Sequence, residues 1–174
     1  MDEDLLPWPV FDLVRLPGGA DLEVPRRILG GEYVALDAAY VLDRNPRAGL
    51  IAFGRDAGGG FFCVTADTGH VVYVVTDTAP ETVPVNTDLA RFRECARAVV
   101  ELFPFGEDPA AEPDDRSDGA AEAHERAGAA VRAVTERIDP PLVEAGGFWF
   151  DLSYDIAMGD RAVRWYRPPA GPTG

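Results

Sequence analysis

The sequence predicts an α+β fold, a single domain in which a largely antiparallel sheet of about five or six strands is packed against helices. Two observations predict this class. Short runs rich in β-branched and aromatic residues, separated by glycine-containing turns, fill the first half of the chain. The helical patterns come afterwards, between residues 88 and 158. Strands joined by short turns pair as antiparallel neighbours, and helices that follow them can cover the sheet.

The central strands are the clearest part of this pattern. Three apolar runs are separated by two glycine-containing turns, in the order 50–53, 54–60, 61–64, 67–69 and 71–75. Two β-rich runs around an Asp-x-Gly turn predict a hairpin. The segment 54–60 lacks the Gly-Lys-Ser/Thr ending of a phosphate-binding loop, and a strand follows it. We therefore expect its glycines to provide positive φ angles in a tight turn that Asp56 caps.

The outer strands are less regular. Val10 to Leu16 predicts a strand that ends at a Pro-Gly-Gly turn, and residues 20–31 predict a loop or a short helical turn. Residues 32–42 predict one or two strands, although the pattern also permits a helix. The polar residues between 76 and 85 predict a loop.

Three helices follow. Apolar residues recur at spacings of three and four in the segments 88–103, 120–138 and 147–158. Thr87 is the expected N-cap of the first helix, and Ser117 or Asp118 that of the second. Gly159 is expected to end the third helix.

The formal net charge is −14. Such a charge disfavours direct binding to nucleic acids or to anionic membranes, because both would repel the protein. It would speed association with a basic partner, although an acidic surface also serves solubility alone. We see no secretory signal at the acidic N-terminus and no apolar run long enough to cross a bilayer, so we expect a cytoplasmic protein.

One segment concentrates the acidic residues. Residues 106–119 are expected to form a mobile acidic loop within a single domain of residues 1–167, followed by a frayed tail at 168–174. The loop is either a solvated connector or a surface that contacts a basic partner. If it contacts a partner, the expected contact residues are Glu107, Asp108, Asp114 and Asp115, together with Asp56 of the glycine turn.

The residues available for catalysis are few. Cys63 and Cys95 lie in a strand and on the apolar face of a helix, as buried thiols do, and His70 and His124 are far apart in the sequence. This distribution gives neither a Cys–His pair nor the spacing of a zinc site. We expect no catalytic residues, metal or other cofactor.

The order of the motifs resembles the SUKH superfamily, with the type-four immunity proteins of bacterial toxin systems as the most similar branch. The matching segments are Phe53 to Gly59, Asp67 to Gly69, Val85 to Cys95, Ile138 to Leu142, and Phe148 with Trp149. Phe53 and Arg55 depart mildly from the pattern.

The resemblance implies the same architecture and a non-enzymatic immunity protein that binds and neutralises a cognate toxin of the nuclease or deaminase class. It carries over no contact residue, because immunity surfaces are tailored to each toxin. An acidic surface suits this role, since nucleases hold phosphates on basic surfaces. The first alternative is a general protein-interaction module with a cellular partner other than a toxin, and the second is a small hydrolase that uses carboxylates without a metal. The sequence does not predict the oligomeric state.

Overall fold

The computed structural model describes residues 11–18, 21–29, 32–42, 49–75, 82–103, 105, 118–142 and 147–160. This part of the chain contains eight strands, three α-helices and a short 3-10 helix. In sequence order they are β1 (Leu13–Leu16), β2 (Leu22–Pro25), β3 (Arg27–Ile28), β4 (Tyr33–Val41), β5 (Leu50–Arg55), β6 (Phe61–Thr65), β7 (Val71–Val74), β8 (Thr82–Asn86), α1 (Leu89–Glu101), α2 (Asp118–Ile138), η2 (Pro140–Leu142) and α3 (Phe148–Ala157).

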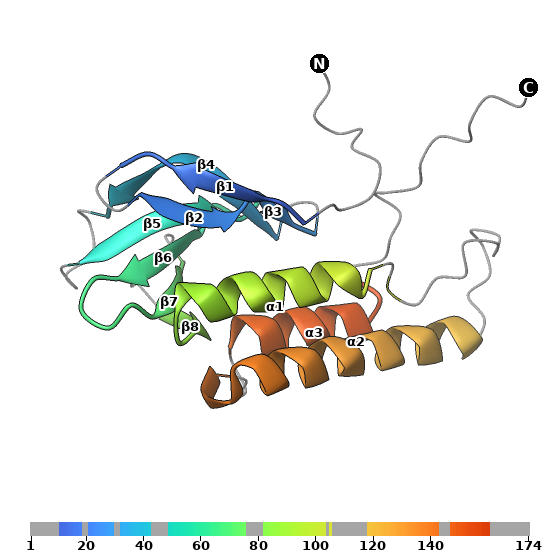
Figure 1. The fold of residues 1–174 in the computed structure, drawn as a ribbon. Helices are drawn as coiled ribbons and strands as arrows, with labels where there is room; N and C mark the ends of the chain where they lie inside the picture. The colour runs from blue at the N-terminus through green and yellow to red at the C-terminus, as the bar shows by residue number, and fades with distance from the viewer. Residues whose placement is uncertain are drawn as a thin grey trace, which may run out of the picture.

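Strands β3 to β8 form one antiparallel sheet in which every strand lies beside its neighbours in the sequence. Strands β1 and β2 pair as a separate antiparallel hairpin that contacts β4 and α1. All three helices follow the last strand and lie together on one side of the sheet (Figure 1). The predicted α+β class, the antiparallel sheet and the late helices are therefore confirmed.

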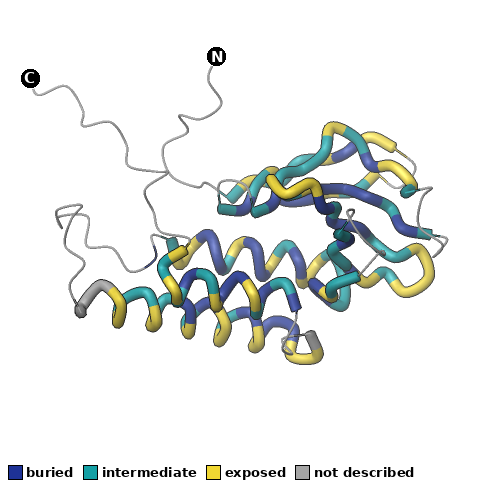
Figure 2. The backbone as a smooth tube through the Cα atoms, turned by 180° about the vertical axis from the view of Figure 1, so that it is seen from behind, coloured by how far each residue is buried: buried dark blue, intermediate teal, exposed yellow. Residues whose placement is uncertain are grey.

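The main core lies between the sheet and the helices and is rich in aromatic rings. Tyr33 of β4 and Phe62 of β6 are fully buried and contact Phe92 of α1, which in turn contacts Trp149 of α3. The ring centroids of Tyr33 lie 5.0 Å from those of Phe62 and 5.3 Å from those of Phe92, both edge-to-face. Such pairs contribute about 0.5–1.5 kcal/mol beyond area burial. Exposed residues line the outer sides of the helices (Figure 2).

Strand β5 contributes to this core through a β-bulge. Its register with β6 shifts between Ala52 and Gly54, which makes Phe53 an extra residue. Phe53 lies in the main core, and Gly54 lies against the ring of Tyr33, where an added Cβ would come within 2.0 Å of a ring carbon. Ala52 instead joins a smaller apolar cluster with Leu50, Cys63 and Val74. Gly54 is therefore required by close packing.

Two predictions for the outer strands were wrong. Residues 20–31 contain β2 and β3 where a loop or helical turn was expected, and residues 82–86 form β8 where a loop was expected. Val24 of β2 is fully buried opposite Val14 of β1, so its place depends on pairing with another segment. β8 accommodates Pro84 because it is an edge strand of the sheet, in which N–H groups on the outer side form no ladder bond. The segment 32–42 forms one strand, β4, and not a helix.

The helix ends differ slightly from those predicted. Asp88, not Thr87, caps α1, since its Oδ1 accepts a hydrogen bond from the Arg91 N–H at 2.8 Å. Helix α2 begins at Asp118, two residues before the predicted start, so residues 118 and 119 of the predicted loop are helical. Gly159 has a φ of 78° after α3, which confirms it as the stop of that helix. The cap predicted at Ser117 and the tail at 168–174 lie outside the described residues.

Candidate functional site

Asp56 is the predicted contact residue that the structure places. It lies half-buried in the turn between β5 and β6, where its Oδ1 accepts a hydrogen bond from the Gly60 N–H at 2.8 Å. Its Oδ2 accepts one from the Tyr73 hydroxyl at 2.6 Å. Burial, and then this hydrogen bond, raise the pKa of Tyr73. The predicted turn cap is confirmed, whereas a contact between Asp56 and a partner stays a prediction.

The glycines around Asp56 serve two different purposes. Gly59 has a φ of 87°, the positive angle that the sequence predicted for this turn. Gly60 instead leaves space for the Tyr73 side chain, because a Cβ added at Gly60 would lie 2.1 Å from the Tyr73 hydroxyl oxygen. The turn is thus built around the hydrogen bond between Tyr73 and Asp56.

The other four predicted contact residues, Glu107, Asp108, Asp114 and Asp115, lie outside the described residues. Their role in binding stays a prediction.

A buried polar cluster joins β8 to the end of α2 and the start of α3. Asp139 is 1% exposed, and its carboxylate accepts hydrogen bonds from the Asn86 amide at 2.9 Å, the Thr87 N–H at 2.8 Å and the Thr87 hydroxyl at 2.9 Å. The Asn86 carbonyl oxygen in turn accepts from the Trp149 indole N–H at 2.9 Å. The Asn86 amide also lies 3.5 Å from the Cys95 sulfur.

These contacts give the buried cluster a structural role. The side chains of Asn86 and Asp139 satisfy one another inside the protein, as buried polar groups must. The segments Val85 to Cys95 and Ile138 to Leu142, on which the family resemblance depends, meet at this junction. The sequence showed both segments but not their contact, which joins residues 52 and 53 positions apart.

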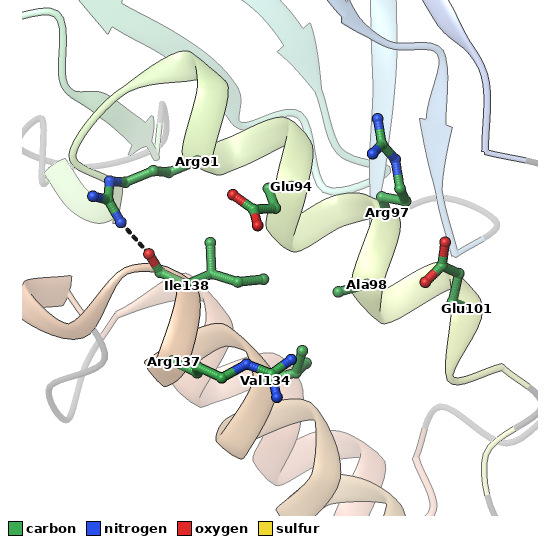
Figure 3. A pocket seen from close by; sticks show the side chains of 8 residues that line it. All are labelled: Arg91, Glu94, Arg97, Ala98, Glu101, Val134, Arg137 and Ile138. Atoms are coloured by element: carbon green, nitrogen blue, oxygen red, sulfur yellow. Dashed lines mark hydrogen bonds between the residues drawn. The ribbon is translucent and has the colours of Figure 1, made fainter.

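A groove of about 600 Å³ lies between α1 and α2 (Figure 3). Its α1 side carries Arg91, Glu94, Arg97 and Glu101, so positive and negative side chains alternate along it. The guanidinium of Arg91 donates to the carbonyl oxygen of Ile138 at the end of α2. A wall of mixed charge does not favour a ligand of either sign.

The candidate catalytic groups lack the features of a reactive site. Cys63 and Cys95 are free and buried, and burial raises the pKa of each thiol to about 12. His70 is exposed, and His124 is half-buried beside Gly159. The described residues include no group of three or more His, Cys, Asp or Glu side chains placed to hold a metal ion. Within the same part of the chain, no helix has the length and apolar composition that a bilayer crossing needs.

Helix α3 presents apolar side chains on two sides. The predicted inner stripe is confirmed, since Trp149, Leu152 and Ile156 are buried. On the outer side, Tyr154 is 59% exposed and Met158, at the C-cap, is 61% exposed. The sequence pattern indicated the inner stripe and not these two residues. Their exposure could have been predicted from the sequence, because both residues lie outside the apolar stripe that faces the core.

Comparison with known proteins gave one match. The family model described as SUKH-4 immunity protein matches residues 27–155, from the first residue of β3 into α3. Searches of curated proteins and of solved structures found no significant match.

Proposed function

Because the chain belongs to the SUKH-4 immunity protein family, we propose that it binds the toxic domain of a bacterial polymorphic toxin and neutralises it without catalysis. The family match over residues 27–155 carries this proposal. It extends over the whole six-stranded sheet and over α1, α2 and most of α3. The matched region thus includes most of the core and the buried junction around Asn86 and Asp139.

Neutralisation by binding alone is supported by the state of the thiols. A thiol must ionise to act as a nucleophile, and thiols with a pKa of about 12 stay protonated near neutral pH. Cys63 and Cys95 are also buried in the two apolar clusters. They therefore suit packing better than catalysis.

The toxin that we propose is a nuclease or a deaminase with a basic surface. The resemblance to the superfamily suggests these classes, and the net charge of −14 agrees with them on physical grounds. Enzymes that act on nucleic acids bind phosphates through basic side chains, and an acidic protein can cover that surface with fast association.

The test starts from the reading frame adjacent to this gene, whose C-terminal domain is purified as the candidate toxin. Residual toxin activity is measured while purified protein is titrated against it. We expect inhibition to be complete near one equivalent and complex formation to be visible by calorimetry. Inactivation of the toxin at a small fraction of an equivalent would show a catalytic mechanism. Absence of both binding and inhibition would refute the proposal and favour a partner other than a toxin.

The electrostatic part has a separate test, because salt screens the steering of charged partners. The association rate constant is measured between about 0.05 and 0.5 M salt, over which the Debye length shortens severalfold. We expect the association rate to fall steeply and the dissociation rate to change less. An association rate that does not change with salt would contradict a basic toxin surface.

A further inference from the structure

We propose that the outer face of α3, formed by Asp151, Tyr154 and Met158, contacts the toxin, and that the toxin surface opposite it is basic. This inference rests on the proposed function and adds the place of binding. We call these three residues the α3 face.

The two apolar residues of the α3 face form one continuous surface. The Met158 N–H donates to the Tyr154 carbonyl oxygen at 2.9 Å, so the two residues lie one helical turn apart on the same side. Both side chains are more than half exposed, whereas the opposite side of α3 is buried in the core. Tyrosine and methionine are enriched in protein interfaces, and tyrosine is frequent among the residues that dominate binding energy.

The α3 face stands on a rigid base. At Gly128 of α2, an added Cβ would lie 2.5 Å from the Ser153 carbonyl oxygen and 2.7 Å from the Ala157 Cβ. Helices α2 and α3 therefore pack as closely as their backbones allow. On the inner side, Trp149 ties α3 to β8 through its hydrogen bond to Asn86. A surface that is ordered before binding loses less entropy when the complex forms.

The charges around Tyr154 and Met158 favour a basic partner. Residues 147–160 contain Asp151, Asp155 and Asp160, of which Asp151 and Asp160 are exposed, and Arg161 follows outside the described residues. Burial, and then the carboxylate of Asp155, raise the pKa of Asp151, so neighbouring acidic groups act on one another here. A second copy of this chain would bring like charges together, which disfavours self-association through this face.

One basic side chain of α2 that lies beside α3 is already in contact with an aromatic ring. The guanidinium of Arg132, on α2, lies 4.8 Å from the ring centroid of Phe150. This contact is made at the first turn of α3, away from Met158 at the other end of the helix. The described residues include no ion pair to Asp151, so its carboxylate is available to a basic partner.

The experiment measures binding of the candidate toxin domain, purified as described above, to the wild-type protein and to four variants by surface kinetics. The double variant Tyr154→Ala/Met158→Ala should weaken binding by about 30-fold or more, as removal of central interface residues does. Asp151→Arg should slow association by about tenfold and reduce its dependence on salt.

Matched controls use another exposed apolar pair and another exposed aspartate. Tyr40 and Val41 of β4 are 42% and 59% exposed, and Asp37 lies exposed on the same strand. Tyr40→Ala/Val41→Ala and Asp37→Arg should leave binding unchanged. Circular dichroism and the urea midpoint of each variant verify its fold.

The outcomes separate the site from the function. If the wild-type protein binds and the α3 variants bind equally well, the α3 face is refuted and the proposed function stands. If the β4 variants weaken binding and the α3 variants do not, the contact lies on the sheet. If the wild-type protein is a dimer that the double variant dissociates, the α3 face binds a second copy and the inference is wrong. If the wild-type protein does not bind the toxin, both proposals fail.

Discussion

Replacement of Asp139 tests the buried junction between β8, α2 and α3. Asp139→Ala removes the acceptor of three hydrogen bonds and leaves the Asn86 amide and both Thr87 donors without it. A buried donor that loses its acceptor costs about 1–3 kcal/mol, and more where the lost acceptor was charged. We expect the free energy of unfolding to fall by about 3–5 kcal/mol, not by the sum of three bonds.

A second substitution separates charge from hydrogen bonding. In Asp139→Asn, the amide oxygen can occupy the Oδ2 position and accept from Asn86 and from the Thr87 N–H, while the amide nitrogen donates to the Thr87 hydroxyl. The number of hydrogen bonds is kept and their ionic character is lost, so we expect a smaller decrease of about 1–2 kcal/mol. Asp37→Ala, at an exposed aspartate, should change stability by no more than about 0.5 kcal/mol.

The assay is urea unfolding at pH 7, followed by far-UV circular dichroism, with the slope against urea compared among the variants. An equal slope shows that the same surface is exposed on unfolding, so the midpoints can be compared directly. A loss of less than about 1 kcal/mol in Asp139→Ala would refute the view that this junction stabilises the fold, because surface substitutions alone approach that range.

Three further predictions concern the core. Gly54→Ala should destabilise the protein by about 1–3 kcal/mol because its Cβ would lie 2.0 Å from the Tyr33 ring, whereas in Gly58→Ala the nearest atom is 3.4 Å away and the urea midpoint should barely move. Tyr33→Phe should be neutral or stabilise by up to about 1 kcal/mol, since the buried hydroxyl has no hydrogen-bond partner among the described residues; a clear loss would reveal such a partner. Burial raises the pKa of the Cys63 and Cys95 thiols from 9.0 to about 12, so the neutral thiols stabilise the folded state fully below pH 9 and this stability is lost as the pH rises toward 12. Iodoacetamide at pH 8 should label both thiols only after urea unfolding, and rapid labelling of the folded protein would contradict this prediction.

Local sequence was sufficient for the strands and helices that have strong patterns of their own. The hairpin between β6 and β7 and the three helices were predicted because each pattern lies within one segment. Strands β2 and β3 were not predicted because they are short and depend on pairing with other segments. β2 pairs with β1, and β3 pairs with β4. Strand β8 was missed because Pro84 and its polar neighbours are typical of loops, and only the edge position accommodates them.

In the candidate site, too, local contacts could be predicted from the sequence and contacts between distant segments could not. The sequence predicted Asp56 as a turn cap, since an aspartate in a glycine-rich turn can bond to a nearby N–H. It did not predict the bond from Tyr73 to the same carboxylate, which requires the pairing of β6 with β7. Tyr154 and Met158 fall off the apolar stripe of α3 in the sequence, but their exposure depends on how α3 packs against α2 and β8.

By itself, the sequence determined the α+β class, the order of strands before helices, the acidic charge and the family, because these depend on composition and on patterns along the chain. The tertiary structure alone decided which polar residues are buried in the fold and which apolar residues remain on its surface. Asn86 and Asp139 lie 53 positions apart in the sequence, and they form a hydrogen bond because α2 ends beside β8 in the fold. Burial is a property of packed neighbours, and neighbours in space are not set by the residues adjacent in the chain.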